Sequence, residues 1–183
     1  LETFGFIHDG LIYMSNVEAL FCLKAPYFHL LVGKPSDLCN VESKVHLKPN
    51  VFIEIIQGDK CDTASHLFKE FAKAFSFPSY FGENWAAFDE CINDLEWINK
   101  EGYILLITKV DKLLAKDEDF KIFINTLHRA IQEWVEGRSY DSFPTTPTPF
   151  HVVFQSDHKN INDRFERVGI GSSEMDILTY CIE

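Results

Sequence analysis

Three apolar runs of strand length constrain the fold of this chain more than any other feature. They are VFIEIIQ (51–57), YILLITKV (103–110) and FHVVFQ (150–155). The middle run is nearly continuous in apolar residues, which is typical of a strand that is buried on both faces of its sheet. Segments with helical spacing separate the runs, and strands that alternate with helices form parallel sheets through right-handed crossovers. The sequence therefore predicts an α/β fold with a small three-stranded parallel sheet flanked by helices.

Three helices are predicted around these strands. Asp62 or Thr63 can cap the first, because their side-chain oxygens accept hydrogen bonds from free amides of a first helical turn. Asn84 can cap the second in the same way. The third covers 120–135, has one apolar stripe, and ends at Gly137.

The segments outside this core carry further strand signals. Two apolar runs flank His8-Asp9-Gly10 and predict a hairpin, since Asp-Gly suits a tight turn. YFHLLVG (27–33) and ILTYCIE (177–183) predict single strands, which could form a separate small sheet or extend the main one. The predicted organisation is an N-terminal β-rich extension (1–50), a central α/β domain (51–155), and a C-terminal helix–strand extension packed on the same body (156–183).

Net charge and cysteine spacing narrow the class of protein. The formal net charge of −11 opposes direct binding of nucleic acid, which needs a basic surface, and favours attraction to a cationic partner. No run approaches the roughly 18 apolar residues of a membrane helix, so we expect no membrane partner. The five cysteines form no CxxC motif, and their irregular spacing favours a reduced, cytoplasmic compartment.

No pattern of catalytic or metal-ligating residues stands out. The seven histidines form none of the HxH, HxxxH and HExxH motifs, so we expect no metal and no cofactor. The chain also lacks a glycine-rich phosphate loop. We therefore expect that the protein is not an enzyme.

The stretch FPSYFGENWAAFDECINDLEW (77–97) is acidic and contains no Lys or Arg. Such a cluster can bind a metal, perform acid–base chemistry, make a helix face soluble, or contact a basic partner. A solvated helix face usually mixes Glu with Lys, because opposite charges at i,i+4 stabilise it. The absence of cations, with Tyr80 beside the acids, favours the partner surface, since aromatic side chains are frequent at the centres of interfaces.

A helix that begins after Asn84 has two different faces at 100° per residue. One face is apolar and predicts a buried stripe: Trp85, Phe88, Ile92 and Leu95. The other face is acidic, and alanines keep its middle low, so that a partner could approach closely. The residues predicted to face outward are Glu83, Ala86, Glu90, Asn93 and Asp94.

The motif SYFGENWAAFDECINDL resembles the signature of the barstar family, the small intracellular inhibitors of barnase-type ribonucleases. The signature reads Tyr-aromatic-Gly-x-Asn, an apolar residue, a short acidic stretch, and then Cys-apolar with Asp-Leu soon after. The resemblance covers about residues 51–155, with strands and helices in the family's order. It implies a barstar-like three-layer fold, to which this chain adds N-terminal and C-terminal strands.

The resemblance also implies a function. In the family, the second helix and the loop before it plug the active site of a ribonuclease, and their carboxylates replace the phosphates of RNA. We therefore expect a cytoplasmic inhibitor of the antitoxin or immunity type, with a basic ribonuclease or toxin nuclease domain as its partner. The open alternative is a barstar-fold interaction module with a non-nuclease partner. The implied partner-binding residues are Tyr80, Gly82, Asn84, Ala86, Asp89, Glu90 and Asp94.

Several positions depart from the family pattern. Glu90 matches the central carboxylate, for which the best-studied member has Asp, and Ala86 stands where that member has a second inhibitory Asp. Asp89 stands where it has Trp, and could take over part of the lost charge. A third family carboxylate falls near Arg129, a basic residue. These departures concern the identity of the target rather than the fold.

Overall fold

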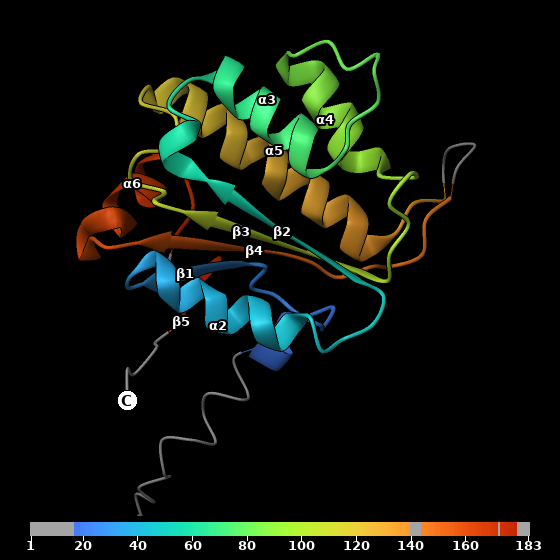
Figure 1. Cartoon of the computed structure of the whole chain (residues 1–183), viewed down its shortest axis with the longest axis horizontal. Helices are drawn as coiled ribbons and strands as arrows, with labels where there is room; N and C mark the ends of the chain where they lie inside the picture. Colours follow the sequence, from blue (N-terminus) through green and yellow to red (C-terminus); the bar gives the residue numbers. More distant parts are fainter. Residues whose placement is uncertain (1–16, 140–143, 172, 179–183) are drawn as a thin grey trace, which may run out of the picture.

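A single five-stranded sheet organises the chain (Figure 1). The computed structural model describes residues 17–139, 144–171 and 173–178. All neighbouring strands run parallel, in the order β2-β3-β4-β1-β5. The strands are β1 (Phe28–Val32), β2 (Val51–Gln57), β3 (Gly102–Thr108), β4 (Phe150–Ser156) and β5 (Met175–Leu178).

The three predicted core strands are confirmed as β2, β3 and β4. Every residue of β3 and of β4 is buried, as expected for strands that have neighbours on both edges and helices on both faces. The flanking strands extend this sheet rather than forming a second one: β1 lies between β4 and β5. The sheet therefore has five strands where the central domain alone predicts three.

Helices cover both faces of the sheet. In Figure 1, α3, α4 and α5 lie over one face and α2 lies under the other. The α-helices are α2 (Pro35–Val45), α3 (Ala64–Ala74), α4 (Trp85–Asp94), α5 (Asp117–Glu136) and α6 (Asn162–Arg167), with short 3-10 helices η1 (Gly58–Lys60) and η2 (Lys159–Ile161).

Helix α2 was not among the predicted elements. It begins at Pro35, whose missing N–H costs nothing in a first helical turn. Leu38, Val41 and Val45 repeat at helical spacing and are buried. The described part of the predicted β-rich extension therefore holds helical residues at 17–19, one five-residue strand and one eleven-residue helix. The predicted hairpin around His8-Asp9-Gly10 lies outside the described residues.

The two layers between sheet and helices have different compositions. The layer under α3, α4 and α5 is rich in aromatic rings; Phe71, for example, meets Phe88 edge-on with ring centroids 5.0 Å apart. The layer above α2 is aliphatic and includes Leu106 and Val153 of the sheet. Successive residues of β3 and β4 alternate between these layers, as the pleat of a strand requires.

The C-terminal segment follows the predicted order of a short helix and then a strand. β5 begins at Met175, two residues before the predicted strand, and pairs with β1. Residues 179–183, the rest of the predicted strand, lie outside the described residues. None of the helices in the described ranges is long and apolar enough to span a bilayer.

Candidate functional site

Helix α4 begins where the sequence predicts. Asn84 adopts an extended backbone and its Oδ1 accepts a hydrogen bond from the Ala87 N–H at 3.0 Å. Its Nδ2 donates to the Gly82 carbonyl at 3.2 Å, so one side chain ties the preceding loop to the first turn. At the other end, Leu95 is left-handed (φ 45°), and this conformation terminates the helix.

The apolar face of α4 fixes its orientation on the body of the protein. Phe88, Ile92 and Leu95 are fully buried, which confirms three of the four predicted stripe residues. Trp85 is half-buried and packs edge-on against Phe68, with centroids 4.9 Å apart. Trp134 of α5 also donates its Nε1–H to the Ile92 carbonyl at 2.9 Å. The opposite face is therefore presented on a rigid support.

The exposed face of α4 and the loop before it form what we call the acidic surface. Tyr80 is the most prominent side chain there, with 71% of its area exposed. No Lys or Arg occurs between Lys73 and Lys100, so no cation of this segment offsets the acids. The exposed residues of the acidic surface are Tyr80, Gly82, Glu83, Asn84, Ala86, Glu90, Asp94 and Glu96.

The acids influence the tyrosine beside them. Desolvation of the hydroxyl, followed by the negative charges of Asp94, Glu90 and Glu96, raises the pKa of Tyr80. The same acids also act on the cysteine of this helix. Burial, together with the negative charges of Glu90 and Asp94, raises the pKa of Cys91 to about 11. The acids contribute to both shifts, so the local potential is negative, and such a potential attracts cations.

Asp89 does not belong to the acidic surface as a free charge. Its Oδ2 lies 2.8 Å from Nη2 of Arg129 on α5, and this hydrogen-bonded pair raises the pKa of the guanidinium. The expectation that Asp89 takes over part of the lost charge stays a prediction, and this ion pair within the protein does not favour it. Arg129 and Asp89 both depart from the expected family pattern, and the positive charge of Arg129 offsets the negative charge of Asp89.

Asn93 was predicted to face outward, and this prediction is wrong. The residue is 8% exposed, and its Nδ2 donates to the Asp89 carbonyl at 3.0 Å and to Asp89 Oδ1 at 3.3 Å. Arg138 covers it from the end of α5 and donates to the Asn93 carbonyl at 2.6 Å. Helical periodicity predicts the direction in which the Asn93 side chain points from α4. It does not predict that Arg138, at the end of α5, covers this residue.

The comparison with known families decides the class of the chain. The family described as Barstar (barnase inhibitor) matches residues 51–155, which is more than half of the sequence. The chain belongs to the barstar family. No curated protein matches the chain significantly.

Comparison with solved structures adds information on the fold. A chain from "Structure of Drosophila ORC bound to AT-rich DNA and Cdc6" matches with a TM-score of 0.54 and 14% identity, over 92% of this chain and 55% of that one. The corresponding structure with GC-rich DNA gives 0.52 and 14%, over 97% and 61%. The barstar-family chain spans little more than half of those chains, and at this identity the likeness concerns the fold alone.

Family membership places the site residues in context. The structure exposes both Tyr80 and Glu90 on one surface, and the family roles that the resemblance implies for them stay predictions. Gly82, Asn84, Ala86 and Asp94 are exposed beside them. Their contact with a partner stays a prediction, and Asp89 differs from the others because it is paired within the protein.

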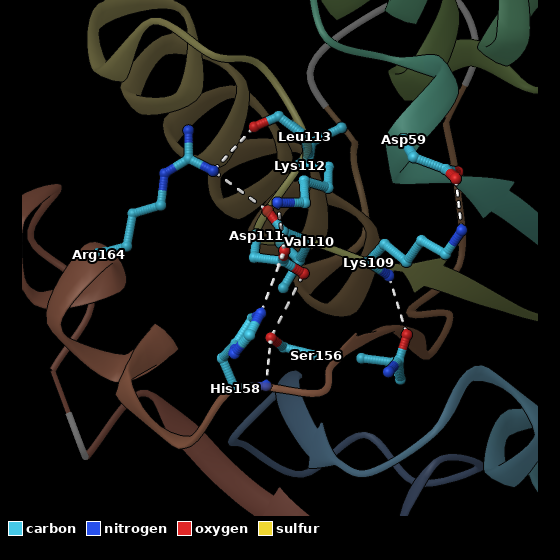
Figure 2. Close-up of polar contacts among 10 residues, drawn as sticks. Asp59, Lys109, Val110, Asp111, Lys112, Leu113, Ser156, His158 and Arg164 are labelled. Atoms are coloured by element: carbon cyan, nitrogen blue, oxygen red, sulfur yellow. Dashed lines mark hydrogen bonds and ion pairs between the residues drawn. The ribbon is translucent and has the colours of Figure 1, made fainter.

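A second polar cluster lies at the carboxyl ends of the strands (Figure 2). Asp111 lies 3.5 Å from Ser156 Oγ and 3.9 Å from His158 Nε2, while Lys109 pairs with Asp59. Arg164 of α6 donates to main-chain carbonyls of the loop after β3. These contacts join loops together. Among the residues that the structure describes, no group of three or more His, Cys, Asp or Glu side chains is arranged to hold a metal ion.

The N-terminus of α2 lies at the same carboxyl ends of the strands, but it is not free to bind a phosphate. Ligands of parallel sheets often bind where a strand leads into a helix N-terminus, whose free amides attract anions. Here the Asp37 carboxylate accepts a hydrogen bond from the Lys34 N–H at 2.8 Å, so the chain's own acid occupies the N-terminus of α2. Among the described residues, the acidic surface on α4 is the exposed surface to which the resemblance to the family points.

Proposed function

We propose that the protein inhibits a ribonuclease or a related nuclease toxin by direct contact, with the acidic surface of α4 placed over a cationic active site. The observation that carries this proposal is the geometry of α4. Its carboxylates Glu90 and Asp94 are exposed beside Tyr80, without an intervening cation, on a helix that is fixed by a buried apolar face.

Electrostatics supports the same pairing. The active site of a ribonuclease binds phosphates and is therefore cationic, so an acidic surface is steered toward it and speeds association. Once in contact, carboxylate–guanidinium pairs gain strength from desolvation and from their paired geometry. The short side chain of Ala86 does not protrude from the centre of the surface, which leaves room for long Arg and Lys side chains of the partner.

The proposal can be tested with a barnase-type ribonuclease and the intact protein. RNA cleavage is followed while the protein is titrated into the enzyme. Loss of cleavage at a one-to-one ratio supports inhibition. Full cleavage at a large molar excess, together with no detectable complex, contradicts an inhibitor of that enzyme class.

A second candidate function is an interaction module with a non-nuclease partner. The Arg129–Asp89 pair favours it, because this pair and Ala86 reduce the negative charge that a phosphate-mimicking surface carries. Photo-crosslinking from position 80 in the native cell extract distinguishes the two. Crosslinks to a nuclease support the inhibitor, and crosslinks only to proteins without nuclease activity support the module.

We further propose that the protein acts in the cytoplasm and without catalysis of its own. Irregular cysteine spacing supports a reducing compartment. Burial raises the pKa of two thiols, that of Cys61 to about 12 and that of Cys91 to about 11, which disfavours nucleophilic thiolates. A hydrolase screen of the purified protein checks this point, and turnover would contradict it.

A further inference from the structure

Strand β2 forms one edge of the sheet and, among the described residues, pairs with β3 alone. An edge strand presents a row of main-chain N–H and C=O groups to which another strand can bind, and proteins usually guard it with a short strand, a proline, a lysine or a bulge. β2 has seven residues, an unbroken register with β3, and neither proline nor lysine. Its only charged residue is Glu54. β5, at the opposite edge, has four residues.

The main-chain groups that face outward from β2 can be identified from a contact at its start. The Asn50 carbonyl accepts a hydrogen bond from the Glu101 N–H at 2.9 Å, so it faces β3. In a parallel ladder, the main-chain groups of successive residues point alternately to the two sides of the strand. The N–H and C=O groups of Val51, Ile53 and Ile55 therefore face away from the sheet. Those of Val51 and Ile53 make no hydrogen bond among the described residues.

The carboxylate of Glu54 lies over this open edge. It accepts a hydrogen bond from the Ile55 N–H, one of the groups that face outward. Partial burial, the largest influence, and the charge of Glu42 on α2 raise the pKa of Glu54, and this hydrogen bond opposes them. Glu54 has no ion pair among the described residues, so the centre of the edge carries a negative charge without a cation. Ile53 and Ile55 are half-buried beside it.

We propose that the edge of β2 binds an extended, basic segment of a partner protein, which adds a sixth strand to the five-stranded sheet. The outward main-chain groups of Val51, Ile53 and Ile55 supply the hydrogen bonds, and side chains at alternate positions supply the specificity. The charge of Glu54 selects a segment in which Lys or Arg alternates with apolar residues. A cation that pairs with Glu54 also releases the Ile55 N–H for the new ladder. The proposal does not rest on nuclease inhibition, because none of these residues belongs to the acidic surface of α4.

The same charge argues against a second copy of this chain as the occupant. An antiparallel pair of two β2 strands centred on Glu54 places the two carboxylates opposite each other, and like charges in that position destabilise a sheet. Each copy also carries a formal net charge of −11, which adds to the repulsion. Glu54 therefore protects the edge from self-association and leaves it open to a cationic strand.

The test uses the full chain and a labelled peptide of the same length as β2, capped at both ends, in which Val and Lys alternate. Fluorescence anisotropy measures the binding, and amide hydrogen exchange locates it. We expect saturable binding that slows exchange at Val51 and Ile53 by roughly tenfold or more, because their N–H groups gain partners. Exchange at Phe52 and Ile56, whose N–H groups face β3, should be slow with and without the peptide.

Two comparator peptides separate the contributions to binding. A peptide that is N-methylated at every residue keeps the charges but donates no main-chain hydrogen bond. A peptide in which Glu replaces Lys keeps the hydrogen bonds but places like charges beside Glu54. Each should bind roughly tenfold or more weakly than the Val–Lys peptide.

Variants assign the binding to the edge of β2. Glu54→Lys should weaken binding of the Val–Lys peptide by roughly tenfold or more, since it places a cation where the peptide brings its own. Glu166→Lys, the same change at an exposed position on α6, should leave the affinity nearly unchanged. Slow exchange at Phe52 in the Glu54→Lys variant shows that β2 is still paired with β3.

Four outcomes would overturn the proposal. Equal binding of the N-methylated peptide means that charge alone attracts the peptide to the surface. Absence of saturable binding, or binding that leaves exchange at Ile53 unchanged, means that the edge is not the site. Slow exchange at Ile53 without peptide, which depends on protein concentration, means that a second copy occupies the edge.

Discussion

Arg129 of α5 holds Asp89 of α4 in an ion pair with 2.8 Å between Nη2 and Oδ2. The two residues lie 40 positions apart in the sequence, and the resemblance to the family marks each as a departure from the expected pattern. Together they turn one of the acids of the signature motif inward, toward a neighbouring helix. The negative charge that faces solvent is thereby concentrated on Glu83, Glu90, Asp94 and Glu96.

Removal of Arg129 tests this arrangement. Arg129→Ala leaves Asp89 unpaired and adds a free charge to the surface, so a cationic partner should bind more tightly by about 1 kcal/mol, roughly fivefold, at low salt. The gain should shrink as salt screens it. Stability should fall by less than about 1 kcal/mol, because the Arg129 side chain is 59% exposed and the Asp89 side chain 32% exposed, so that water screens the pair. Calorimetry at two salt concentrations measures the change. Weaker binding would mean that Arg129 itself contacts the partner.

Glu90 should dominate the affinity for a nuclease. Glu90→Ala is expected to weaken the complex by about 2–5 kcal/mol, because it leaves a partner cation buried and unpaired. The barnase–barstar complex is itself among the examples behind this range, so the figure describes the family rather than this chain in particular. Glu166→Ala, with the same loss of charge on α6, is the matched control and should change the dissociation constant little. Equal effects of the two changes would count against a specific role for Glu90.

His29 of β1 and His151 of β4 form a buried pair with 2.9 Å between Nε2 and Nδ1. We expect this pair to make the stability of the protein depend on pH. Burial lowers the folded-state pKa of His29 from 6.5 to about 3, and lowers that of His151 as well. A depressed histidine pKa means that the unfolded chain binds protons more readily, so this stability is complete above pH 6.5 and is lost as the pH falls below it. His29 alone should account for a loss of about 2 kcal/mol by pH 5, and His151 adds to it.

Denaturant unfolding at pH 8 and at pH 5 measures this loss. The double variant His29→Gln, His151→Gln serves as the reference, because its amides do not titrate in this range. The wild type should lose at least about 2 kcal/mol more than the variant between the two pH values. If both proteins lose the same free energy of unfolding between pH 8 and pH 5, the histidines are not held neutral in the folded protein.

Asn84 should contribute to stability apart from any contact with a partner. Asn84→Ala removes the hydrogen bond to the Ala87 N–H and should lower the free energy of unfolding by about 1 kcal/mol. Asn84→Asp keeps an oxygen acceptor at the cap and should retain most of that stability. Urea unfolding compares the variants. If the Asn84→Ala and Asn84→Asp variants have the same free energy of unfolding, the cap at position 84 contributes little to stability.

Local patterns in the sequence were sufficient for the elements that carry the candidate site. The cap at Asn84 and the stripe of Phe88, Ile92 and Leu95 depend on residues within one helix, and both are confirmed. The positions of β2, β3 and β4 follow from apolar runs of the right length. Helix α2 had comparable signals in Pro35 and its spaced apolar residues, but its polar composition concealed them.

Contacts between distant segments could not be read from the sequence. The burial of Asn93 depends on Arg138, which lies 45 residues later. The His29–His151 pair joins positions 122 residues apart, through strands whose adjacency follows only from the complete sheet order. Periodicity predicts the direction of a side chain relative to its own element, while its neighbours are decided by tertiary packing.

The flanking strands should be indispensable to the family domain. Truncation to residues 51–155 removes β1 and exposes the edge of β4, which is entirely buried in the intact chain. An unprotected apolar edge pairs with other copies, so the fragment should aggregate at concentrations where the full chain does not. Sedimentation of both proteins at matched concentration measures this. A monomeric, cooperatively folded fragment would contradict the prediction.

The position of β1 has a consequence for the order of events during synthesis. This early strand can be enclosed only after β4 and β5 have been made, near the other end of the described chain. Contacts between such distant segments form slowly, because a long loop must close before they contribute. A nascent chain on the ribosome therefore carries an incomplete sheet until β5 has been synthesised, and this is the interval in which we expect it to depend most on chaperones.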